Sequence, residues 1–170
     1  YRIPATVAAD TVAAQYAGSI LTNTPNGRLY KQFVETGKAA NVYAFTIGGV
    51  APGLGVIAAQ VRKGEAIEPV RDALIAAIES FADTPPTAQE MERVRRDSAN
   101  AVERVLNDPE RIAVAMSEYV ALGDWRFFFF NRDRMADKMR DPAMQGAIVA
   151  AVRAMSEAML DMRVAPGQRL

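Results

Sequence analysis

The chain has 170 residues, of which 50% are apolar and 24% charged, a composition typical of one globular domain. Lys and Arg total 20, as do Asp and Glu, and the resulting formal net charge of zero argues against a nucleic-acid partner, because such a protein needs excess cation to neutralise phosphate. The absence of cysteine and histidine excludes disulfides, thiolate and imidazole catalysis, and ligation of a metal by either residue. No apolar run approaches the ~18 residues that a membrane helix needs.

The first residues, Tyr1 to Pro4, alternate apolar and polar side chains, which predicts the end of a strand. The chain starts with Tyr rather than Met and lacks the charged and apolar regions of a signal peptide. We therefore expect residues 1–170 to form a single domain that is a fragment of a longer, multidomain chain.

A helix is predicted to begin at Asp10, as its cap, and to end near Thr22. Val12, Tyr16 and Ile20 recur at every fourth position and give this helix one apolar side.

The turn residues Asn23 to Gly27 separate this helix from a second, shorter one. The second helix should run from Arg28 to Thr36, with Leu29 and Phe33 on its inner side, and should end at Gly37.

Two strands are predicted next, Val42 to Ile47 and Leu54 to Val61, because both segments are rich in β-branched, aromatic and other apolar residues. The glycines between them, Gly48-Gly49-x-x-x-Gly53, favour the turn of an antiparallel hairpin over a phosphate-binding loop, because no helix follows them. Both strands are apolar at odd and even positions. We expect helices to cover one face of the sheet and a partner domain to cover the other.

From Ile67 the chain is predicted to be helical almost to its end. The first helix of this part carries an apolar stripe at spacings of three and four. The members of the stripe are Ile67, Val70, Leu74, Ile78 and Phe81.

Sequence signals mark the later helix starts. After Pro85-Pro86, Thr87-x-x-Glu90 forms a capping box, and Asp108-Pro109 and Asp141-Pro142 each combine a cap with proline at the first helical position. The last helix should end near Ala158, and Asp161 to Ala165 is a candidate final strand. This order of elements predicts an α+β fold, with an antiparallel-rich sheet covered on one face by several helices.

The segment from Ser117 to Arg134 concentrates the only Trp and four of the seven Phe of the chain. Gly123-Asp124 stops one helix and caps the next, so we predict a helix corner whose aromatic residues, Trp125 above all, fill a core. Asp124 with Arg132-Asp133-Arg134 should form a structural ion-pair network, with substrate binding by an Arg as the minor alternative.

Other polar groups are interpreted as structural. The turn Asn23 to Arg28 leads into a helix start, where an anion would be the minor alternative to a plain cap. The carboxylates between Glu90 and Glu110 alternate with arginines, which is typical of solvated helix faces with local ion pairs. These carboxylates are Glu90, Glu92, Asp97, Glu103, Asp108 and Glu110.

Several segments spread over nearly the whole chain form an ordered set of motifs. They are Pro25 to Glu35 (P-N-G-R-L-Y-K-Q-F-V-E), Ala39 to Phe45, Asp83 to Glu92, Leu106 to Arg111, and Leu122 to Arg126 with Arg132 to Arg134. This set resembles the peptidase M16 family of pitrilysin, insulinase and mitochondrial processing peptidase, and the later segments resemble a subgroup of large bacterial members.

The resemblance implies a metallohydrolase-like domain of a zinc metalloendopeptidase, in which repeated α+β domains enclose a chamber for an unfolded peptide. The family holds zinc with an H-x-x-E-H helix and a distal Glu, and this chain has no histidine. The resemblance therefore implies a non-catalytic domain, favours the second domain of the first half, and places zinc in another domain of the parent. The resemblance also favours the bacterial periplasm or cell envelope as the location of the parent protein.

In some M16 domains an Arg and a downstream Tyr help to bind the substrate, and the matching positions here hold Val34 and Asn41. We therefore expect no catalytic, cofactor-binding or metal-binding residue in this chain. The leading hypothesis is a chamber-wall domain that packs against the zinc-bearing domain of the same parent and helps to enclose the peptide substrate. The alternative is a structural or assembly module from a catalytically inactive M16-like protein; a carboxylate-based hydrolase is a remote third. The isolated chain is expected to self-associate through an uncovered apolar sheet face.

Overall fold

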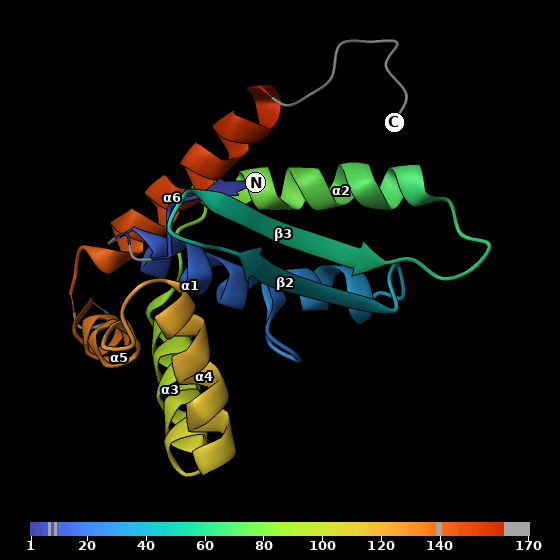
Figure 1. The fold of residues 1–170 in the computed structure, drawn as a ribbon. Helices are drawn as coiled ribbons and strands as arrows, with labels where there is room; N and C mark the ends of the chain where they lie inside the picture. The colour runs from blue at the N-terminus through green and yellow to red at the C-terminus, as the bar shows by residue number, and fades with distance from the viewer. Residues whose placement is uncertain (7, 9, 139–140, 162–170) are drawn as a thin grey trace.

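The sheet of this protein is three-stranded and antiparallel, with the strand order β1-β3-β2 (Figure 1). The structure is a computed structural model that describes every residue except 7, 9, 139–140 and 162–170. The strands are β1 (Arg2–Ile3), β2 (Asn41–Ile47) and β3 (Gly53–Gln60). β2 and β3 form the predicted hairpin, in which Tyr43 lies opposite Ala58 and Ile47 opposite Leu54.

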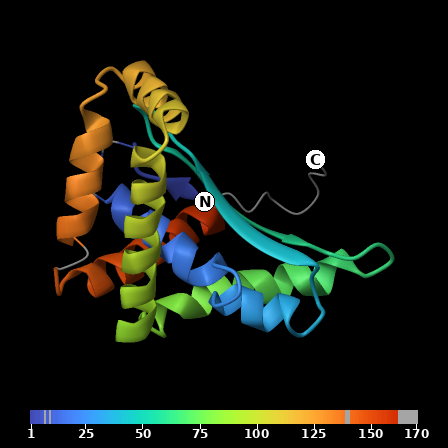
Figure 2. The same cartoon turned by 90° about the horizontal axis from the view of Figure 1, so that it is seen from below.

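Three helices cover one face of the sheet, as Figure 2 shows from below. They are α1 (Thr11–Thr22), α2 (Ile67–Glu79, extended by the 3-10 turn Ser80–Ala82) and α6 (Met144–Asp161). The core between the layers is apolar: Tyr16 and Leu21 of α1, Ile148 and Val152 of α6 and Val42 of β2 are all buried. The predicted α+β architecture is confirmed.

α1 begins where the sequence predicts, but the cap prediction was wrong. Asp10 occupies the cap position with helical backbone angles (φ −84°, ψ −10°), and its side chain makes no capping hydrogen bond. A capping side chain needs the more extended backbone that directs it back over the first turn. The Thr11 hydroxyl instead donates to the Ala5 carbonyl at 2.5 Å and ties the start of the helix to the preceding loop.

The predicted short helix after the turn is present, and its central part, Tyr30–Val34, is a π-helical turn. Leu29 and Phe33 are buried as expected. Gly37 follows with φ +77°, a left-handed conformation that favours glycine, and the chain then enters β2.

α3 (Ala88–Leu106) and α4 (Pro109–Ala121) form a pair that extends away from the sheet (Figure 1). The capping box is confirmed, because the Thr87 hydroxyl accepts from the Glu90 N–H and the Glu90 carboxylate accepts from the Thr87 N–H. Asp108 caps α4 as predicted by accepting from two main-chain N–H groups. No residue of α4 is buried, so α4 adds little to the core, whereas α3 contributes Val94 to it.

The apolar stripe of α2 is buried at Val70, Ile78 and Phe81. Ile67 is an exception, with 64% of its surface exposed, because it lies in the first turn of the helix, beyond the edge of the core.

α5 (Phe127–Lys138) begins at the corner that Gly123, with φ +106°, and Asp124 create. The prediction that Trp125 fills a core was wrong, because 48% of its surface is exposed. The corner joins α5 to the projecting arm rather than to the sheet, so its aromatic rings pack against one another. Trp125 meets Phe129 edge to face at 6.1 Å, and Phe129 meets Phe128 at 5.1 Å.

The Asp141 carboxylate accepts from the Ala143 N–H at 2.8 Å, but this bond closes a turn, and α6 begins only at Met144. Pro142 is therefore not the first helical residue that the sequence predicted. The helix runs to Asp161, past its expected end at Ala158. The strand prediction is therefore wrong at Asp161, and residues 162–165 of that prediction lie outside the described residues. No helix in the described part of the chain is long and apolar enough to cross a membrane.

Candidate interaction surface

The polar turn between α1 and the π-helical turn is built around Arg28 rather than around an anion. The Arg28 guanidinium donates to both oxygens of the Glu90 carboxylate, at 2.7 and 2.8 Å. It also donates to the carbonyl oxygens of Thr84 and Pro85, at 2.7 and 3.1 Å, and lies 4.7 Å from the centre of the Phe81 ring. Its charge is thus already used within the fold, which argues against an anion site.

The bonds from Arg28, with those from Thr87, lower the pKa of Glu90 from 4.5 to about 2. Only 16% of the Glu90 side chain is exposed, so solvent screens this ion pair weakly. Glu90 also completes the capping box of α3. The Arg28–Glu90 pair therefore joins the α1 turn, the end of α2 and the start of α3.

The position before Arg28 requires glycine, because the turn leaves no space there for a side chain. A side chain at this position would bring its Cβ within 2.7 Å of the Asn23 nitrogen and of the Leu21 oxygen. The turn is also tied to α3, because Arg93 donates to the Asn26 carbonyl at 3.1 Å. The R-L-Y motif thus has a structural role at this junction.

The predicted local pairing of carboxylates with arginines is confirmed for two members of the set, whereas Glu90 pairs with the distant Arg28. Glu92 pairs with Arg95 and Asp108 with Arg111, both at a spacing of three residues. Within the described residues, no three Asp or Glu side chains are grouped so that they could hold a metal ion. The part of the chain that the structure describes therefore does not fit a zinc site.

At the α4–α5 corner, Asp124 pairs with Arg126, a residue that the predicted ion-pair network did not include. The two carboxylate oxygens accept from the Arg126 guanidinium at 2.7–2.9 Å, and this bonding lowers the pKa of Asp124. The side chains of Arg132 and Arg134 lie outside the described residues. Sequence reasoning missed Arg126 because a spacing of two residues is not a helical pairing pattern.

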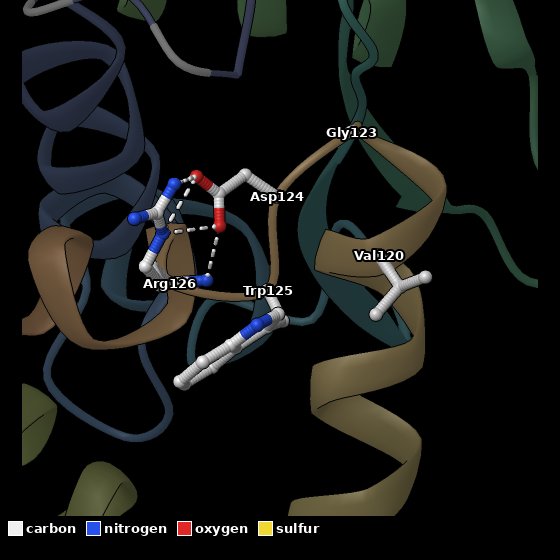
Figure 3. A pocket seen from close by; sticks show the side chains of 5 residues that line it. All are labelled: Val120, Gly123, Asp124, Trp125 and Arg126. Carbon is white, nitrogen blue, oxygen red and sulfur yellow. Dashed lines mark hydrogen bonds and ion pairs between the residues drawn. The ribbon is translucent and has the colours of Figure 1, made fainter.

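This pair borders an open cleft of about 380 Å³. Figure 3 shows Asp124 and Arg126 turned toward each other beside the Trp125 ring, with Val120 of α4 across from it. The charges of Asp124 and Arg126 neutralise each other, so the residues that line the cleft offer no unpaired charge to a ligand. Val120 and Trp125 form its apolar side.

The face of the sheet opposite the helices carries the largest exposed apolar side chains of the two long strands. Tyr43, Phe45 and Ile47 of β2 and Leu54 of β3 are 45–59% exposed. Tyr43 and Phe45 stack at 6.2 Å, and the cross-strand pairs place Ile47 beside Leu54. No described helix covers this face, which is turned to the viewer in Figure 1. We call these four residues the open face.

The positions that match the family's substrate-binding pair lie beside this sheet. Val34 closes the π-helical turn, and Asn41 is the exposed first residue of β2. Neither offers a cationic or phenolic group.

Comparison with protein families and solved structures agrees with this architecture. Residues 1–97 match the family model of the peptidase M16 inactive domain. A crystal structure of a candidate zinc protease from Bordetella pertussis Tohama I is 38% identical with a TM-score of 0.76; the alignment covers 89% of this chain and 83% of that one. The inactive peptidase domain of a candidate zinc protease from Bordetella parapertussis is also 38% identical, with a TM-score of 0.77. That alignment covers 89% of this chain and 81% of the Bordetella parapertussis chain.

A protease from Helicobacter pylori shares the fold at 14% identity, with a TM-score of 0.79; the alignment covers 91% of this chain and 36% of that protein. No curated protein matches the chain. The fold and the aligned sequence define a non-catalytic peptidase domain, and the chain belongs to the peptidase M16 inactive-domain family.

Proposed function

We propose that residues 1–170 form the non-catalytic domain of an M16 zinc metalloendopeptidase. The domain packs against the zinc-bearing domain of the same parent chain and forms part of the wall that encloses the peptide. Zinc, held in the other domain, supplies the activated water for peptide hydrolysis. This chain supplies shape and stability to that assembly and takes no part in proton transfer.

The observation that carries this proposal is the open face. Monomeric proteins rarely expose a contiguous patch of large apolar side chains unless a partner covers it. Here the β2–β3 ladder and the three helices on the other side of the sheet hold the patch in place (Figure 2). A second domain of similar construction fits such a surface better than a small molecule does, since small ligands favour concave pockets.

A structural or assembly module remains the alternative, and the open face supports it equally well as a docking surface. The two functions differ in what precedes this domain in the parent. An H-x-x-E-H motif about one domain length upstream favours the protease, and its absence favours the module.

Reconstitution tests the proposal. The zinc-bearing domain of the parent, mixed with this chain, should cleave an unfolded peptide at least about tenfold faster than alone, and Phe45→Lys should abolish the gain by burying an unpaired charge in the contact. Val114→Lys is the matched control, because Val114 is at least as exposed as Phe45 (58% against 46%) but lies on the projecting α4. Equal stimulation by the wild type and Phe45→Lys would contradict a contact through the open face.

A further inference from the structure

The outer edge of β2 is unpaired. β2 lies at the margin of the sheet, and no other described strand pairs with it there. The direction in which the main-chain groups of β2 point can be derived from the other side of β3. There, Tyr1 and Gly55 exchange both of their main-chain hydrogen bonds. Gly55 therefore points toward β1, and the alternate residues of β3 point toward β2, as the Gln60 carbonyl does in accepting from Ala40.

The register then decides which residues of β2 face outward. Tyr43 and Phe45 lie opposite Ala58 and Val56, whose main-chain groups point toward β2, so these two residues bond to β3. Val42, Ala44 and Thr46 alternate with them and direct their N–H and C=O groups away from the sheet. They form a row of donors and acceptors at strand spacing.

This edge lacks the features that normally block strand pairing. Natural edge strands carry Lys, Pro, a bulge or a covering loop that prevents edge-to-edge association. β2 reads N-V-Y-A-F-T-I, without a charge or a proline, and pairs in regular register along its whole length. The opposite edge of the sheet is protected over part of its length by β1.

Space for a second backbone lies directly beside this edge. A groove of about 340 Å³ runs between α1 and β2, lined by small or uncharged residues that include Gly18, Ser19 and Thr22 of α1 with Ala44 and Thr46 of β2. A Cβ on Gly18 would lie 3.6 Å from the Ala44 Cβ, so α1 and β2 approach closely at the floor of this groove.

We propose that two copies of this chain pair β2 to β2 in antiparallel orientation, about a twofold axis through Ala44, to form one continuous sheet. Val42 of one copy then bonds to Thr46 of the second copy, and Ala44 bonds to its own counterpart. Such an interface is isologous, because the same edge serves both copies.

The sequence of β2 favours a second copy over an unrelated strand. Reversed about Ala44, the segment pairs Val42 with Thr46, residues of similar shape, and Tyr43 with Phe45. On the open face this register places the Tyr43 ring of each copy opposite the Phe45 ring of the other, and such cross-strand aromatic pairs stabilise sheets. The stack that Tyr43 and Phe45 already form would continue across the axis. No like charges meet, because the edge carries none.

This inference stands apart from the proposed function. Edge pairing uses main-chain groups, whereas contact with the zinc-bearing domain uses side chains on the open face. Failure of one therefore leaves the other standing.

The test combines light scattering with amide hydrogen exchange on the unmodified chain. A concentration-dependent monomer–dimer equilibrium is expected, with the amides of Val42, Ala44 and Thr46 slowing by about tenfold or more as the dimer forms. Tyr43 and Phe45 amides, already bonded to β3, should change little. A chain that stays monomeric throughout the concentration range overturns the proposal, as does a dimer in which the outward amides exchange at the monomer rate.

Thr46→Pro provides the matched variant, because it removes one outward N–H without touching the ladder to β3. It should abolish the dimer, while Thr46→Ala should retain it, with circular dichroism showing that both variants fold. A dimer that survives Thr46→Pro with unchanged affinity contradicts edge pairing. Protection of these amides only after an unrelated strand-forming peptide is added would assign the edge to a foreign strand and overturn self-pairing.

Discussion

Replacing Phe33 with alanine is expected to lower the free energy of unfolding by about 3–5 kcal/mol, the range for removing a fully buried aromatic ring from a core. Phe33 has no exposed surface and lies in the π-helical turn against the core that α1, α6 and β2 share. Its loss leaves a cavity that this rigid junction cannot readily fill. Urea unfolding followed by circular dichroism measures the change.

Trp125→Ala is the control, because it deletes a larger ring at an exposed site. With about half of its surface in solvent, Trp125 should contribute roughly 1 kcal/mol, mainly through its edge-to-face contact with Phe129. A greater loss of stability from Trp125→Ala than from Phe33→Ala would contradict the assignment of the core to the π-helical turn.

Replacing Arg28 with alanine should have the second large effect, about 2–4 kcal/mol, because it breaks a weakly solvated bidentate pair and leaves Glu90 without its cation. Arg28→Lys should recover only part of the loss, since an ammonium cannot bridge both carboxylate oxygens and two carbonyls. Arg71→Ala is the matched control; its pair with Asp72 is more than half exposed and should be worth less than about 1 kcal/mol.

The pH dependence gives an independent measure of the same pair. The folded pKa of Glu90, about 2, lies below its ordinary value of 4.5, so this group stabilises the fold above pH 4.5 and loses that effect as the pH falls toward 2. The difference in stability between wild type and Arg28→Ala should therefore shrink from pH 6 to pH 2.5. A constant difference would show that Arg28 acts through packing rather than through charge.

Local signals in the sequence predicted the features that depend on neighbouring residues. The β2–β3 hairpin, the Thr87–Glu90 capping box and the Asp108 cap are set by a few adjacent side chains and main-chain angles. The family motifs, together with the missing histidines, also identified a non-catalytic M16 domain, which agrees with the comparisons reported above.

Features that depend on distant residues were not predictable in the same way. Arg28 and Glu90 are 62 residues apart, so their pairing becomes visible only when the α1 turn meets the start of α3. Trp125 was predicted to lie in a core because its neighbours are aromatic. Its burial depends on where the α4–α5 corner lies in the fold, and this corner follows the α3–α4 pair, which extends away from the sheet (Figure 1). Which main-chain groups of β2 point away from the sheet likewise depends on the order of the strands, and the pattern of residues in the sequence does not reveal that order.

The most direct test of the central claim measures zinc and peptidase activity on residues 1–170 alone. The account predicts that the folded chain, incubated with excess zinc and then dialysed, retains less than about one-tenth of an equivalent of metal and does not cleave an unfolded peptide, because structural and catalytic zinc sites need converging ligands that the described residues lack. Stoichiometric zinc binding together with zinc-dependent cleavage by this chain would contradict it.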